Sequence, residues 1–266
     1  CESLVAEAKS LADQGTKELI VVAQDITRYG RDLTGKRMLP QLLTELCKLP
    51  FPWIRLHYLY PDEFTDELIE VIANEPKILK YLDIPIQHAN DKLLRAMNRR
   101  GTKAEIMALF EILRARIPGL VIRTSLITGL PGEGEAEFEE LCDFLRWAKL
   151  ERAGIFPFSP QEGTPAFDMP GQVGEVEAVR RAELLVELQS RVMDEYNEQR
   201  LGTTLEVLCE GFDAAAGCYA GRSYADSPDV DGHVYFTAAG RVPEGELVRV
   251  RITGTTDGDL TGEMED

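Results

Sequence analysis

Apolar runs alternate with amphipathic stretches over the first 160 residues. Continuous apolar runs rich in β-formers are typical of strands buried on both faces. Such runs lie at residues 18–24, 53–60, 81–86, 120–128 and 153–158. Apolar residues at helical spacing predict helices at 2–14, 40–48, 63–73, 90–98, 103–116 and 134–149. Strands that alternate with helices in this way predict an α/β fold with a parallel sheet.

Two architectures fit this alternation. One is a partial TIM-like barrel, with a further strand expected upstream of the first helix. The other is a doubly wound open sheet, which has the same order of elements. We favour the partial barrel and carry the open sheet as the alternative.

The pattern changes after a long charged helix predicted at 175–200, which Gly202 ends. Polar and apolar residues then alternate with a period of two, which is typical of half-buried strands. We expect strands at 204–210, 218–223, 233–237, 246–252 and 259–263. These short strands and their Gly, Asp and Pro turns predict a small five-stranded antiparallel barrel of OB-like size. The predicted domains are therefore 1–201 and 202–266.

Composition and charge narrow the possible environments and partners. The chain is 44% hydrophobic, which is ordinary for a globular protein, and no apolar run is long enough to cross a bilayer. The first residues do not resemble a signal peptide, so we expect a cytoplasmic protein with no membrane partner. A net charge of −17 argues against nucleic-acid binding and suits a basic partner. Residues 202–266 alone hold four arginines, no lysine and thirteen acidic residues, a net charge of −9.

The cysteines show no metal-binding spacing. Cys1, Cys47, Cys142, Cys209 and Cys218 form neither a CxxC nor a CxxxCxxC motif, so no metal site is predicted. Disulfides are not expected in a cytosolic protein of this size. Cys47 and Cys142 lie on apolar faces of predicted helices and are expected to be small core residues.

The active site of a parallel barrel forms from the loops that follow its strands. Each predicted strand is followed by a polar or Gly/Pro-rich loop, at 24–30, 60–62, 85–90, 128–134 and 159–165. Asp25 could belong to a site or bond loop amides, and His88 could line a ligand pocket or be structural. The Gly-Leu-Pro-Gly turn at 129–132 would let backbone N–H groups approach a ligand. It matches neither GxGxxG nor a Walker motif, so nucleotide phosphate binding is not indicated.

Arg123 interrupts an apolar strand, and a buried arginine needs an anionic partner. Either a carboxylate-bearing ligand or an internal salt bridge to Asp25 or Asp83 would provide one. No Ser/His/Asp, Cys/His or paired-carboxylate arrangement is evident, so no catalytic residue is assigned. A hydrolase or aldolase on a TIM barrel is disfavoured for the same reason.

Five segments, in their order along the chain, resemble the methylthiotransferase branch of the radical-SAM enzymes. They are residues 21–30, 55–73, 81–102, 122–141 and 156–167. The tail resembles a TRAM domain, and its residues 221–236 are similar to the RimO subgroup, which modifies an aspartate of a small-subunit ribosomal protein (number twelve). The MiaB subgroup modifies an adenosine in tRNA instead. The tail and the acidic charge favour the first subgroup, because ribosomal proteins are basic.

The resemblance implies a partial barrel of the radical-SAM type and a transferase reaction. The family uses S-adenosyl-L-methionine and two [4Fe–4S] clusters, one on a CxxxCxxC loop and one on an N-terminal domain. The resulting radical abstracts hydrogen from the β-carbon of the aspartate, which receives a methylthio group. The cofactors perform this chemistry, while the protein orients and shields it.

Matched position by position, the resemblance implies a set of residues near S-adenosyl-L-methionine. Arg123 would pair with the methionine carboxylate, the turn at 129–133 would support the methionine portion, and the backbone at 158–159 would face the adenine. The full set is Gln24, Gln87, Arg123, Gly129, Phe158 and Ser159.

The chain also departs from the family. Neither the CxxxCxxC loop nor the N-terminal cluster domain is present, and Cys1 is not expected to be a ligand. We therefore expect the chain as given to bind no cluster and to be inactive. The alternative from another class is a non-catalytic acidic module that binds a basic protein.

Overall fold

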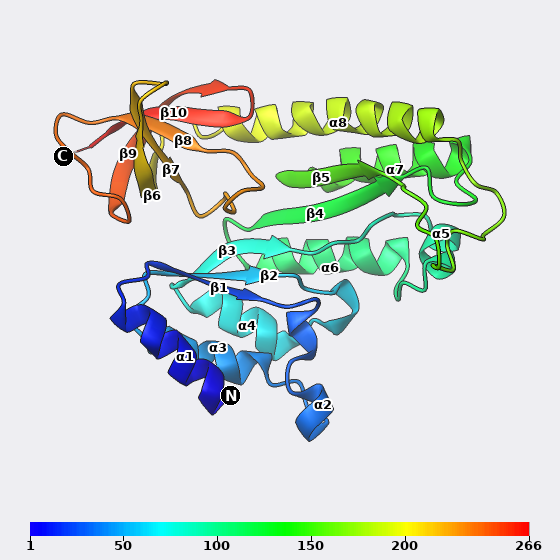
Figure 1. Cartoon of the computed structure of the whole chain (residues 1–266), viewed down its shortest axis with the longest axis horizontal. Coiled ribbons are helices and arrows are strands. Elements are labelled where there is room, and N and C mark those ends of the chain that lie inside the picture. Colours follow the sequence, from blue (N-terminus) through cyan, green and yellow to red (C-terminus); the bar gives the residue numbers. More distant parts are fainter. Residues whose placement is uncertain (266) are drawn as a thin grey trace.

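The computed structural model describes residues 1–265. Its first part is a curled sheet of parallel strands in the spatial order of the sequence (Figure 1). The strands are β1 (Glu18–Val22), β2 (Trp53–His57), β3 (Ile78–Asp83), β4 (Val121–Thr128) and β5 (Arg152–Pro157). The principal helices are α1 (Glu2–Asp13), α3 (Leu39–Cys47), α4 (Asp66–Asn74), α6 (Lys103–Arg116), α7 (Glu135–Ala148) and α8 (Glu175–Glu198). Shorter helical segments are η1 (Ile26–Arg28), α2 (Arg31–Thr34), η2 (Pro61–Glu63) and α5 (Asp91–Ala96).

The helices cover one face of the sheet. One apolar core contains Leu56 of β2, Leu82 of β3 and Leu126 of β4. The same core contains Phe110 of α6 and Leu185 of α8. A doubly wound sheet would have helices on both faces. The partial α/β barrel is therefore confirmed.

The predicted boundaries shift where local chemistry ends an element. The strand predicted at 81–86 is found at Ile78–Asp83, because Pro85 has no N–H for the ladder. The helix predicted from residue 63 begins at Asp66, since the Thr65 side chain accepts a hydrogen bond from the Leu68 N–H. A Thr102–Glu105 capping box starts α6 at its predicted position.

The second part is a small closed barrel. It is built from β6 (Thr204–Asp213), β7 (Cys218–Arg222), β8 (Val234–Thr237), β9 (Leu247–Thr256) and β10 (Asp259–Met264). Val207, Phe236 and Val250 fill its core. The five-stranded barrel is confirmed, with one correction: β8 and β10 pair in parallel, whereas the other neighbours are antiparallel.

The loop at residues 223–231, between β7 and β8, packs against the concave face of the large sheet. Asp226 forms an ion pair with Arg152 of β5 at 2.6 Å, and Asp231 accepts a hydrogen bond from Tyr81 Oη at 2.5 Å. Ser227 Oγ lies 3.0 Å from His57 Nε2. We call this segment the interdomain loop. Its contacts are buried, so it joins the two barrels into one body.

Glu18 extends the same contact between the two barrels. Its two oxygens bind Arg55 of β2 and Arg222 of β7, each at 2.6 Å. Burial alone would raise the pKa of Glu18, but Arg55 and Arg222 more than offset this and hold the pKa below its ordinary value.

The low pKa of Glu18 makes the stability of the protein depend on pH. A carboxyl whose pKa is lower in the folded state stabilises the fold above its unfolded pKa, and this contribution is lost as the pH falls through the folded pKa. We expect the melting temperature of the wild type to fall more steeply between about pH 5 and pH 3 than that of Glu18→Gln. Calorimetry at a series of pH values would measure this. Parallel curves for the two proteins would contradict the assignment.

Within residues 1–265, none of the helices combines the length and the apolar character needed to cross a membrane.

Candidate functional site

Five of the six predicted site positions lie at one rim of the large sheet. Gln24 follows β1, Gln87 follows β3, Gly129 follows β4, and Phe158 and Ser159 follow β5. Parallel neighbouring strands bring their carboxyl ends to the same edge, which is at the right of Figure 1. The rim therefore gathers these residues, and their roles stay predictions.

Backbone contacts fix two of these positions. Gln87 continues the sheet past Pro85, because its N–H donates to Ser125 O at 2.9 Å and its carbonyl accepts from Ile127 N at 2.8 Å. Its φ of 70° is unusual for a residue with a side chain and costs about 1–2 kcal/mol. The Phe158 N–H donates to Thr128 O at 2.8 Å, so the end of β5 stays attached to that of β4. Gln24 is exposed.

The turn after β4 packs closely against α8. Gly129 has a φ of +75°, and a Cβ at this position would lie 2.2 Å from Ala178 Cβ. Its N–H donates to Glu133 Oε1 at 2.9 Å, and the Gly132 N–H donates to Gly171 O at 2.8 Å. These two N–H groups already have partners, so the turn offers a ligand its surface rather than these donors.

A buried polar cluster supports this turn. Glu133 Oε1 lies 2.9 Å from Arg181 Nη1 of α8, and its other oxygen lies 3.4 Å from His88 Nε2. Burial alone would raise the pKa of Glu133, but His88, the Gly129 amide and Arg181 hold it below the ordinary value. His88 Nδ1 also accepts a hydrogen bond from the Asn90 N–H at 2.9 Å. His88 is fully buried, which supports a structural role for this histidine over a place in a ligand pocket.

Arg123 lies away from the rim. It is near the amino end of β4, about 16 Å from Thr128 at the usual strand rise of about 3.3 Å per residue. Its Nη1 is 3.0 Å from Asp83 Oδ2, and its Nε is 3.7 Å from Asp231 Oδ1 in the interdomain loop. Of the two expected partners, the geometry therefore favours the internal salt bridge over a ligand carboxylate. The strand thus places Arg123 away from the rim that holds the other five predicted positions, and its role toward S-adenosyl-L-methionine stays a prediction.

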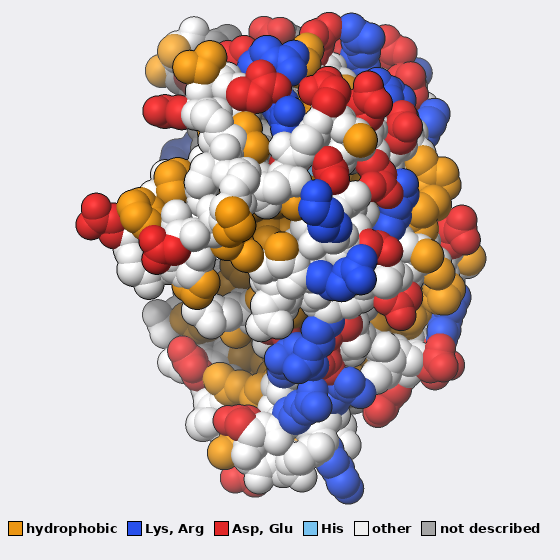
Figure 2. All heavy atoms as spheres, turned by 90° about the vertical axis from the view of Figure 1, so that its right-hand side faces the viewer, with side chains coloured by type: hydrophobic (Ala, Val, Ile, Leu, Met, Phe, Trp, Pro, Cys, Tyr) orange, Lys and Arg blue, Asp and Glu red, His pale blue; other side chains and the backbone are white. Residues whose placement is uncertain are grey.

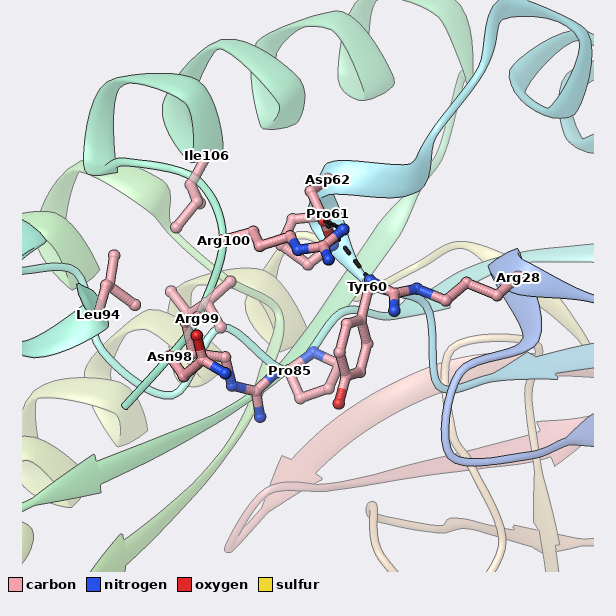
Figure 3. A pocket seen from close by; sticks show the side chains of 11 residues that line it. Arg28, Tyr60, Pro61, Asp62, Pro85, Leu94, Asn98, Arg99, Arg100 and Ile106 are labelled. Carbon is pink, nitrogen blue, oxygen red and sulfur yellow. Dashed lines mark ion pairs between the residues drawn. The ribbon is translucent and has the colours of Figure 1, made fainter. Parts of the chain in front are cut away.

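Sequence reasoning missed a pocket on the same rim. It has a volume of about 180 Å³, and its lining includes Arg28, Tyr60, Arg99 and Arg100 (Figure 3). The guanidinium of Arg99 lies 5.0 Å from the centre of the Tyr60 ring, and that of Arg28 lies 5.7 Å from it. The adjacent arginines at 99 and 100 were the available signal, which the acidic total charge obscured.

Basic side chains gather on this face of an acidic protein, and Figure 2 shows Lys and Arg running down it as a band. We call the members that line the rim pockets the basic band: Arg28, Arg31, Lys36, Arg37, Arg99 and Arg100.

Carboxylates neutralise part of this charge. Glu63 is 2% exposed and lies 3.0 Å from Arg31 and 2.5 Å from Arg37. Burial alone would raise its pKa, but Arg37, Arg28 and Arg31 lower it below the ordinary value. Asp25 accepts a hydrogen bond from the Thr27 N–H at 3.0 Å, so the loop-amide alternative holds for this residue.

The cysteines do not form a cluster site in the part of the chain that the structure describes. They lie at residue 1, on α3, on α7, on β6 and on β7, so none follows a strand of the large sheet. Residues 1–265 also contain no group of three His, Cys, Asp or Glu side chains placed to hold a metal ion.

Comparisons with known proteins match both parts of the chain. The sequence profile of the Radical SAM superfamily matches residues 1–145, and that of the TRAM domain matches residues 201–264. The "Ribosomal protein uS12 methylthiotransferase RimO" of Pelotomaculum thermopropionicum is 49% identical over 98% of this chain and 60% of its own length. The protein of the same name in Acetivibrio thermocellus is 45% identical over 99% of this chain and 58% of its own length. The chain thus spans about 60% of the length of these curated relatives.

A solved structure shares the fold. Coproporphyrinogen III oxidase (HemN) from Escherichia coli, described as a radical SAM enzyme, superposes with a TM-score of 0.55 at 15% identity. The match covers 70% of this chain and 45% of that one. At this identity the similarity concerns the fold alone.

Proposed function

The chain belongs to the radical SAM superfamily, and on this premise we propose that it is part of a methylthiotransferase that modifies an aspartate of ribosomal protein uS12. The observation that carries the proposal is the 45–49% identity to relatives of that name over nearly the whole chain, small barrel included. The arrangement of the rim supports it. A ribosomal substrate also implies that the protein works in the cytoplasm.

The rim suits S-adenosyl-L-methionine, which would supply the radical chemistry when bound with its cluster. Gln87 and Gly129 would border it, with the Phe158–Ser159 backbone on the β5 side. The contribution of the protein is rigidity: Glu133 and Arg181 hold the 129–132 turn against α8, and the curled sheet shields one side. The described cysteines do not fit an iron–sulfur cluster at this rim, so we assign no residue of this chain to one.

The small barrel would help to recruit the basic substrate. Asp226 and Asp231 are used within the protein, so recruitment would depend on the exposed carboxylates of this domain. These are Glu206, Glu210, Asp229, Glu244, Glu246, Asp257 and Glu263. Their charge attracts a basic protein and repels RNA.

A second candidate function is modification of tRNA. The basic band is the observation that favours it, because phosphates bind arginine and lysine. Asp62 and Glu63 lie within this band, and they reduce its attraction for a polyanion.

The test uses the full-length protein, reconstituted without oxygen from iron and sulfide and supplied with S-adenosyl-L-methionine and a reductant. Ribosomal protein uS12 and bulk tRNA are offered together, and both are analysed by mass spectrometry. We expect a methylthio mass gain on an aspartate of uS12 and none on tRNA. A gain on tRNA alone would replace the first function with the second.

A further inference from the structure

We propose that Arg99 binds the side-chain carboxylate of the substrate aspartate in the rim pocket of Figure 3, and that it thereby determines the specificity for aspartate. This inference rests on the proposed function.

Of the three arginines that line this pocket, Arg28, Arg99 and Arg100, Arg99 is the one whose charge is not matched by a carboxylate of the described residues. Arg28, Arg31 and Arg37 all lie within 3.4 Å of Glu63, and Arg100 lies 3.9 Å from Asp62. Among the residues that the structure describes, Arg99 forms no ion pair. Its guanidinium instead lies over the ring of Tyr60. It is therefore free to accept an anion from outside.

The backbone holds Arg99 in place. Helix α5 ends in a Schellman turn, in which the Arg99 N–H donates to Leu94 O at 2.8 Å and the Asn98 N–H donates to Arg95 O at 3.0 Å. Asn98 has the left-handed φ of 55° that this turn requires. Stacking on Tyr60 then limits the side chain as well. Little freedom remains to be lost when an anion binds, which favours affinity.

The chemistry of the pocket suits a carboxylate. An arginine offers parallel N–H donors that match the two oxygens of a carboxylate. The apolar side chains of Leu94 and Ile106 form part of the wall, and they lower the local dielectric and strengthen the pairing. A volume of about 180 Å³ suits one side chain better than a nucleotide, because small-molecule pockets usually exceed about 300 Å³.

The position of the pocket links it to the proposed reaction. Pro85 and Ile86 line it, and the next residue is Gln87, one of the predicted neighbours of S-adenosyl-L-methionine. A carboxylate held by Arg99 would thus bring the adjoining β-carbon to the side of the rim where the radical is expected. RNA is disfavoured as the occupant, because a pocket of about 180 Å³ is too small for a nucleotide.

Binding of a labelled uS12 peptide to the full-length protein tests this inference. Two peptides are compared, one with the target aspartate and one with asparagine in its place, and affinity is measured by fluorescence anisotropy. We expect the wild type to bind the aspartate peptide about tenfold more tightly than the asparagine peptide, as loss of a charged hydrogen bond predicts. Arg99→Gln should bind both peptides equally, at the affinity of the wild type for the asparagine peptide. Arg99→Lys should discriminate less than the wild type, because lysine lacks the paired donors.

Arg95→Gln is the matched control, because Arg95 is an exposed arginine of α5, the helix that precedes Arg99, and it does not line the pocket. It should discriminate as the wild type does. The inference is overturned if Arg99→Gln still binds the aspartate peptide more tightly than the asparagine peptide. It is equally overturned if the variant has an unchanged melting temperature and loses affinity for both peptides by the same factor. It is also overturned if the variant instead loses salt-dependent binding to tRNA. The proposed function is judged separately, by whether the wild-type protein methylthiolates uS12. If it does, and Arg99→Gln still discriminates between the peptides, the proposed function stands and only the role of Arg99 is removed.

Discussion

Replacing Asp226 with alanine is expected to lower the free energy of unfolding by about 3–5 kcal/mol. Asp226 and Arg152 form an ion pair at 2.6 Å, with side chains only 3% and 5% exposed. Alanine would leave the guanidinium of Arg152 buried without its partner, which is the costly way to break such a pair. Asp226 also accepts hydrogen bonds from the backbone and the hydroxyl of Ser223, so the interdomain loop would lose its own support.

Urea denaturation followed by circular dichroism would measure this effect. The control is Arg191→Ala, which removes an ion pair with Glu187 on the exposed face of α8 and should cost less than about 1 kcal/mol. Similar losses for the two variants would show that the interdomain loop does not hold the barrels together.

Gly129→Ala is expected to destabilise the protein by about 2–4 kcal/mol and to weaken the proposed binding of S-adenosyl-L-methionine to the full-length protein. Two costs add at this position. The left-handed φ of +75° disfavours any side chain, and the new Cβ would overlap Ala178 Cβ at 2.2 Å. Relief of this overlap would move the turn away from α8, and with it the surface proposed to meet the cofactor.

Two further variants separate these costs. Gly163→Ala has a similar φ of +81° and nothing within 4 Å of the new Cβ, so it should show the conformational cost alone, about 1–2 kcal/mol. Adding Ala178→Gly to Gly129→Ala removes the nearest clash and should recover part of the lost stability. Equal losses for Gly129→Ala and Gly163→Ala would contradict a role for close packing.

The sequence predicted the architecture because strand and helix periods are local properties. The apolar runs near 18–24 and 120–128 and the helix at 175–200 all reappear with shifts of a few residues. The strand near 81–86 was displaced because Pro85 acts on hydrogen bonding, which hydrophobicity does not report.

The site was predictable only as a set of strand ends. Arg123 lies away from the rim, near the amino end of its strand. Spacing along the sequence does not show which end of a sheet a residue within a strand lies near. The Arg152–Asp226 pair joins residues 74 positions apart, so no local pattern reports it. Residues 221–236 were recognised as a motif, but the sequence did not show that they pack against the large sheet, whose strands lie far away in the sequence. Arg99 was missed because whole-chain charge hides a local excess of the opposite sign.

The interdomain loop also limits how the small barrel could be exchanged between related proteins. Two buried arginines of the large sheet bind partners from the interdomain loop: Arg55 donates to Tyr224 O, and Arg152 pairs with Asp226. Without that barrel they would face solvent on a surface shaped to receive it. The small barrel thus supplies partners for buried charges of the large sheet, so a transplant of this barrel between relatives would have to carry the matching sheet positions with it.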